Sequence, residues 1–155
     1  MQLNQWFVTG LVEGEGCFSI SFTLREKLKF GIETRPSFSI SLNQRDLSLI
    51  KNLHSFFKCG AVRFSKSDRT YKFEVRALDD LMNKIIPHFE KYQLQGDKQK
   101  NFLKFKEICH KMRANLHFNK EHFIQLIEIA YSMNESGKRK HSKNDLLKII
   151  SKSMV

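Results

Sequence analysis

Two glutamates separated by a single glycine form the part of this sequence best suited to chemistry. Glu13 and Glu15 lie in Val8-Thr9-Gly10-Leu11-Val12-Glu13-Gly14-Glu15-Gly16, at the end of a predicted short apolar helix. A helix dipole disfavours negative charge at its C-terminal end, so carboxylates placed there need a reason. A divalent cation held by hard oxygen ligands is one such reason, and a solvated turn with a glycine cap is the alternative.

The same helix carries glycines on one face. Gly10 and Gly14 are four residues apart, so they lie on the same side of the helix. A helix face made of glycine allows another backbone to come very close, as in membrane helix pairs. The polar alternation that begins at Cys17 argues against a membrane segment here.

The chain carries a strong positive charge. Its 155 residues include 27 Lys and Arg against 16 Asp and Glu, a formal net charge of +11, and the isoelectric point is near 9.7. A polyanion is therefore the expected partner, with nucleic acid the first candidate. We see no apolar run near the ~20 residues of a membrane span and no cleavable signal. Three scattered cysteines fit neither disulfides nor zinc, so we expect an intracellular protein with reduced thiols.

Four segments alternate apolar and polar residues with the period of half-buried antiparallel strands. They cover 17–24, 35–42, 61–65 and 71–76. Arginine can bind guanine through two hydrogen bonds, serine can pair with several base edges, and strands can enter the major groove. We therefore predict that the polar side of these strands binds DNA and is not an ordinary solvated face. Its only acid is Glu74. The predicted DNA-binding residues are Ser19, Ser21, Thr23, Arg35, Ser37, Ser39, Ser41, Arg63, Ser65, Lys72, Glu74 and Arg76.

Helical periodicity fills the intervals between and after these strands. We predict helices after an Asp46 cap, over 78–86 up to Pro87, from Lys98 to Met112, after Asn119, and after a capping box at 142–145. This order indicates an α+β protein, in which helices cover one face of a four-stranded antiparallel sheet. No internal boundary is visible, so residues 1–155 are expected to form a single domain.

The motif and its surroundings resemble the LAGLIDADG homing endonucleases. The similarity is strongest over Val8 to Gly16 followed by Cys17-Phe18-Ser19-Ile20, and it continues more weakly at 38–46, 94–102, 119–122 and 133–140. The resemblance implies an αββαββα core with a curved sheet. It also implies an intron-encoded enzyme that makes metal-dependent double-strand breaks at a long pseudo-palindromic DNA target and so promotes intron homing.

Family members carry one or two copies of the motif, and this sequence shows one. The resemblance therefore implies a homodimer, with Gly10, Glu13 and Gly14 at the interface. It makes Glu15 the catalytic metal ligand, assisted by the backbone carbonyl of Gly14, with Mg²⁺ as the expected cation. Glu13 matches the first acid of the motif, whose role in the family is more structural.

Other residues receive roles from the same resemblance. Gln44 is expected near the catalytic water network. Lys98 is our choice for the basic group beside the scissile phosphate, and Lys100 is its rival. The basic run Lys138, Arg139 and Lys140 is expected to contact DNA phosphates.

Two other functions are compatible with the same fold. A catalytically inactive DNA-binding module and an RNA-splicing maturase would both retain the basic charge. The abundance of Lys, Asn, Ile and Phe suggests an AT-rich genome, such as that of a chloroplast or mitochondrion.

Overall fold

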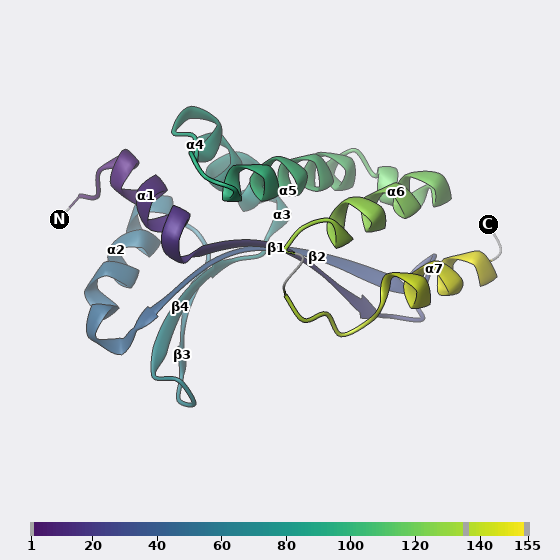
Figure 1. The fold of residues 1–155 in the computed structure, drawn as a ribbon, viewed down its shortest axis with the longest axis horizontal. Helices are drawn as coiled ribbons and strands as arrows, with labels where there is room; N and C mark the ends of the chain where they lie inside the picture. Colours follow the sequence, from purple (N-terminus) through teal and green to yellow (C-terminus); the bar gives the residue numbers. More distant parts are fainter. Residues whose placement is uncertain (1, 135–136, 154–155) are drawn as a thin grey trace. The chain divides into compact units, whose positions relative to one another are not determined.

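The computed structural model describes residues 2–134 and 137–153, and its strands form a four-stranded sheet in the order β1-β2-β4-β3 (Figure 1). The elements are α1 (Gln5–Glu15), β1 (Gly16–Leu24), β2 (Ile32–Asn43), η1 (Gln44–Asp46), α2 (Leu47–Phe57), β3 (Ala61–Ser65), β4 (Thr70–Val75), α3 (Leu78–Asp80), η2 (Leu81–Ile85), α4 (Ile86–Lys91), α5 (Lys98–Arg113), η3 (Leu116–Phe118), α6 (Lys120–Tyr131) and α7 (Lys143–Lys152).

The described residues divide into two compact units. Unit 1 comprises residues up to 18 together with 37–100, and unit 2 comprises residues 19–36 together with those after 100. Strands β1 and β2 each continue from one unit into the other. Among the residues that the structure describes, no helix combines the length and the apolar character needed to cross a bilayer.

Unit 1 has an aromatic core between α2 and the strands. Alternation along β2 and β4 turns Phe38 and Phe73 to one side, where both are fully buried. Phe57 of α2 stacks on Phe73 with ring centroids 5.9 Å apart and meets Phe38 edge-on at 5.8 Å. Antiparallel pairing of β4 with both β2 and β3 fixes the register, so the polar residues of these strands face the other way.

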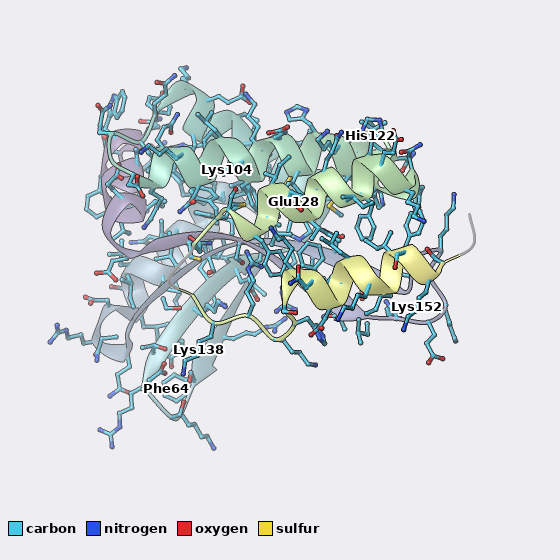
Figure 2. The ribbon with its side chains drawn as sticks, turned by 45° about the vertical axis from the view of Figure 1, so that its right-hand side comes forward. Phe64, Lys104, His122, Glu128, Lys138 and Lys152 are labelled. Carbon is cyan, nitrogen blue, oxygen red and sulfur yellow. The ribbon has the colours of Figure 1, made fainter. Side chains whose placement is uncertain are left out.

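Unit 2 is built on α6. Its helical period places Phe123, Leu126, Ile127 and Ala130 on one buried face. Phe22 of β1 stacks on Tyr131, and α7 packs against α6 through a face that buries Leu146 and Ile150 (Figure 2). Asn119 caps α6 by accepting from the His122 amide, and Ser142 caps α7 by accepting from the Asp145 amide. These caps confirm both predicted helix starts.

Most predicted elements are confirmed, but the start of β2, the cap before α2 and the role of Pro87 differ from the prediction. Strand β2 begins at Ile32 rather than Arg35, which adds Glu33 to its polar side. The polar side therefore carries a second acid besides Glu74. Asp46 precedes α2 but makes no side-chain cap, because Asn43 caps η1 just before it. All three cysteines are free, as expected.

Pro87 does not end the helix in which it lies. The chain stays helical from α3 through the π-helical turn η2 into α4, with Pro87 in the first turn of α4. Proline lacks an amide hydrogen and its ring clashes with the carbonyl four residues earlier in a regular α-helix. The wider π-helical turn relieves that conflict, so the helix continues to Lys91.

Candidate active site and nucleic-acid interface

The C-terminal end of α1 presents Glu15 to solvent. The Gly16 amide caps the helix by donating to the Val12 carbonyl, and the chain then enters β1 at once. A β-carbon at Gly16 would lie 2.6 Å from Val12 Cγ1, so this direct passage requires glycine. Within the described part of the chain, the Glu15 carboxylate is exposed and has no hydrogen-bond or ion-pair partner. An unpaired carboxylate at a negative helix end is suited to holding a cation.

Glu13 lies in a different environment, although only one residue separates it from Glu15. Its Oε2 accepts a hydrogen bond from the Gln95 amide at 2.8 Å, and its Oε1 accepts one from the Gly96 amide at 3.1 Å. A β-carbon at Gly96 would lie only 2.6 Å from that Oε1. Glu13 therefore joins α1 to the segment that leads into α5.

That segment brings Lys98 to the end of α1. Lys98 Nζ donates to the carbonyls of Val12 and Glu13 at 2.9 and 3.0 Å. Lys100 instead pairs with Asp97 at 3.2 Å, in an ion pair whose side chains are 77% and 85% exposed. Lys98 is thus held at the C-terminal end of α1, whereas none of the described contacts joins Lys100 to that helix.

Gln44 also belongs to unit 1. It begins η1, is exposed, and its backbone amide donates to the Arg69 carbonyl at 2.9 Å. None of the described contacts joins its side chain to the end of α1. Its expected role near the catalytic water therefore has no contact in the structure that supports it.

The glycine face of α1 is open. A β-carbon placed on Gly10 or Gly14 would meet nothing within 4 Å. On the same helix the large side chains Trp6 and Phe7 are 55% and 47% exposed, while Val8 and Val12 are buried. Helix α1 thus has a buried side and a side with room for a closely approaching backbone.

On the polar side of unit 1, the cations surround one acid. Glu74 of β4 is buried; its Oε2 accepts a hydrogen bond from Ser37 at 2.9 Å and pairs with Lys72 at 3.1 Å. Its Oε1 pairs with Arg76 Nε at 3.1 Å. We call Ser37, Lys72, Glu74 and Arg76 the Glu74 cluster. Burial alone would raise the pKa of Glu74, but the Ser37 hydrogen bond and the two cations outweigh it and lower the pKa below 4.5.

Strand pairing places further residues next to this cluster. Lys72 is directly opposite Ser41 on β2 and Arg63 on β3, and Glu74 is opposite Ser39. Like charges directly opposite each other destabilise a sheet. The pairing of Lys72 with Arg63, both on the polar side, is therefore a feature that a bound polyanion would stabilise.

In unit 2, the polar sides of β1 and β2 carry Ser19, Ser21, Thr23 and Arg35. Glu33 pairs at 3.2 Å with both Arg25 and Arg35, and the hydrogen bond from Arg35 lowers its pKa. Sequence reasoning missed Glu33, although extending the alternation back two residues from Arg35 would have found it.

The residues of the basic run after α6 lie in two different environments. Lys138 and Lys140 are exposed, and Figure 2 shows Lys138 on the segment before α7. Arg139 is half-buried: its Nη1 donates to the Ile20 carbonyl at 2.8 Å and its Nη2 donates to the Ala130 carbonyl. Its guanidinium carbon lies 4.3 Å from the centre of the Tyr131 ring. We call this arrangement the Arg139 anchor.

Among the described residues, no three His, Cys, Asp or Glu side chains converge. One carboxylate with a neighbouring carbonyl is a partial ligand set. Mg²⁺ is commonly held by one or two carboxylates together with substrate phosphates. Glu15 with the Gly14 carbonyl fits that pattern.

Known proteins are similar to this chain in sequence. A profile described as LAGLIDADG endonuclease matches residues 8–109. A probable intron-encoded DNA endonuclease of Mycosarcoma maydis is 31% identical over 136 residues, which cover 88% of this chain and 48% of the relative. The chain spans half or less of the length of several such curated relatives.

Solved structures agree with this assignment. The homing endonuclease I-TnaI matches with a TM-score of 0.85 at 32% identity, covering 99% of this chain and all of that one. I-SmaMI bound to an uncleaved DNA target in the presence of calcium ions matches with a TM-score of 0.87 at 26% identity, covering 97% of this chain and 50% of that one. The predicted α+β fold is thus confirmed, and this chain belongs to the LAGLIDADG endonuclease family.

Proposed function

We propose that this chain is a site-specific DNA endonuclease that hydrolyses phosphodiester bonds with a divalent metal ion. The unpaired, exposed carboxylate of Glu15, with Lys98 anchored to the same end of α1, is the observation that carries the proposal. Membership in the family gives that pair its context. The inactive alternatives would have no need of a free carboxylate at the negative end of a helix.

Glu15 and the Gly14 carbonyl would hold the cation, for which we propose Mg²⁺. When bound, it would polarise the scissile phosphate and help to generate the attacking hydroxide. Lys98 has three N–H donors, and two of them are used by the Val12 and Glu13 carbonyls. The third remains for a phosphate oxygen, so Lys98 would neutralise charge that develops during hydrolysis.

The proposed DNA contacts come from the polar sides of the strands and from the C-terminal segment. Arg35, Arg63 and Arg76 would read bases, while Lys138 and Lys140 would bind phosphates. We propose that Arg139 holds this segment in place rather than binding phosphate, because two of its N–H groups donate to backbone carbonyls and its half-buried guanidinium lies against the Tyr131 ring.

We also propose that two copies act together as a homodimer through Gly10 and Gly14. The open face of α1 supports this, as does the match of this chain to half of I-SmaMI. A symmetric dimer would favour a long pseudo-palindromic target. We propose one domain over residues 1–155, since β1 and β2 run through both units. We further propose that the protein is encoded in an intron of an organelle genome; the name of the Mycosarcoma maydis relative supports intron encoding.

The activity is tested by cleavage of DNA that spans the gene's own insertion site. Glu15→Gln should abolish Mg²⁺-dependent cleavage while binding to that DNA persists, because the shape is kept and the charge is lost. Glu121→Gln, the same change at an exposed position on α6, is the matched control and should cleave normally. Cleavage by the Glu15 variant at the wild-type rate would refute the assignment of the active site to Glu15.

The dimer is tested without endangering the fold. Because Gly10 and Gly14 have open space around them in a single chain, leucine at either position should leave folding intact. It should nevertheless separate the dimer, since two backbones could no longer approach. Light scattering should give twice the chain mass for the wild type and the chain mass for each variant; a monomeric wild type would contradict the proposal.

A further inference from the structure

The carboxylate of Glu74 is enclosed on the polar side of β4. Its side chain is 8% exposed, and both oxygens are occupied: Oε2 by Ser37 and Lys72, and Oε1 by Arg76. A carboxylate in this state offers no oxygen to a ligand from outside. Glu74 therefore acts on whatever binds this side only through the groups that it holds.

The ion pair with Glu74 leaves the Nη groups of Arg76 available to a ligand. Glu74 pairs with Arg76 through Nε, and the Arg76 side chain is 53% exposed. Arg76 follows β4 directly and has no further partner among the described residues. The guanidinium is planar, so fixing Nε fixes the plane in which the two Nη groups lie. Those two groups form the edge that binds the O6 and N7 atoms of guanine.

Lys72 is held by the other oxygen of the same carboxylate. It lies two residues before Glu74, as Arg76 lies two residues after, so all three are on one side of the chain. Free long side chains lose rotamer freedom when they bind, and side chains that are already ordered lose less. One buried acid thus orders two cations for a partner.

We propose that Glu74 is a positioning residue for sequence recognition: it orients Arg76 to read a guanine in the major groove and holds Lys72 beside it. This inference rests on the proposed function, since it presumes that the polar side binds DNA. It changes the role expected for Glu74 itself, from a DNA contact to the organiser of two contacts.

The test compares Glu74→Gln, Arg76→Ala and the double variant. Each is measured for binding to the cleaved target and to all its single-base variants, with calcium in place of magnesium. Arg76→Ala should identify one base pair at which discrimination falls about tenfold. Glu74→Gln should lose a similar factor at that same base pair, and the double variant should lose no more than Arg76→Ala alone. Affinity for unrelated DNA should not fall, because the substitution removes a negative charge.

Controls separate this inference from simpler explanations. Glu33→Gln removes the corresponding acid in unit 2 and should leave the Arg76 base pair unaffected. Ser37→Ala, a milder change that keeps every charge, should lower discrimination at the Arg76 base pair by a smaller factor.

Two results would overturn the inference. Glu74→Gln could retain full discrimination at the base pair that Arg76→Ala loses, or it could weaken binding to every sequence equally. If Glu74→Gln does not fold, full discrimination by Ser37→Ala would overturn the inference in its place. Failure of the wild type to cleave or bind any target would instead refute the proposed function.

Discussion

The Glu74 cluster and the Arg139 anchor are two basic regions that use arginine in opposite ways. In the Glu74 cluster, a carboxylate holds Arg76 through Nε, and the Nη groups of Arg76 have no partner among the described residues. In the Arg139 anchor, two backbone carbonyls take both Nη groups, and the Tyr131 ring covers the guanidinium. The first arrangement prepares an arginine for a partner, and the second uses an arginine to hold the chain together.

The difference shows that the acceptor, rather than the number of cations, decides what a basic region can do. Ile20 lies on β1, an edge strand of the sheet, whose outward carbonyls would otherwise be open to pairing. By donating to one of them, Arg139 covers part of that edge and fixes the segment before α7. Its neighbours Lys138 and Lys140 stay exposed, as their proposed phosphate contacts require.

The largest expected effect is on stability at the Arg139 anchor. Arg139→Ala should lower the free energy of unfolding by about 2–3 kcal/mol, because two carbonyls lose a charged donor and Tyr131 loses its cover. Arg76→Ala should cost about 1 kcal/mol, since Glu74 keeps Ser37 and Lys72, and Arg63→Ala less than about 0.5 kcal/mol. Urea titration measures all three. Equal losses for Arg139→Ala and Arg63→Ala would show that the anchor contributes nothing to the fold.

The next largest effect is on DNA binding, for which we compare Arg63, a neighbour of the Glu74 cluster, with Lys140, a neighbour of the Arg139 anchor. Arg63→Ala should cost about 1–3 kcal/mol at a few base pairs of the target and little elsewhere. Lys140→Ala should weaken every sequence alike and reduce the slope of log affinity against log salt by about one. Panels of single-base variants at two salt concentrations separate these results. A uniform loss for Arg63→Ala would mean that the polar side of β3 does not read sequence.

Much of this arrangement could be predicted from the sequence, because its causes are local. Period-two alternation placed β3 at its observed residues, and the polar caps Asn119 and Ser142 marked α6 and α7. The glycine and glutamate spacing located the end of α1. Each of these signals lies within a few residues of the structure that it determines.

The roles of individual charges could not be predicted in the same way, because their partners are distant in the chain. Glu13 meets the amides of Gln95 and Gly96, and Arg139 meets the carbonyl of Ile20, across more than 80 and more than 100 residues. A basic run in a sequence looks the same whether its arginine faces solvent or a buried carbonyl. Only the fold determines which acceptor each donor finds.

The smallest expected effect is a difference in pH dependence between the two regions. The hydrogen bond and cations around Glu74 lower its pKa below 4.5, so the unfolded chain takes up a proton first as the pH falls. Stability from Glu74 is therefore present above about pH 4.5 and is lost as the pH drops through the folded-state pKa. His88, whose pKa burial lowers to about 4, adds an acid dependence that both wild type and Glu74→Gln retain, so it cancels in their difference.

Tyr131 in the Arg139 anchor should show the opposite dependence. Burial raises its pKa above 10, although Arg139 acts against this rise and Asp145 adds to it. The folded chain then keeps the phenol proton longer than the unfolded chain, so stability falls as the pH rises above about 10. Urea titrations over both pH ranges should show that Glu74→Gln flattens only the acid side and Tyr131→Phe only the alkaline side. If either substitution changed both sides equally, the two regions would not titrate independently, and the contrast between a carboxylate-held and a carbonyl-held arginine would lose its electrostatic basis.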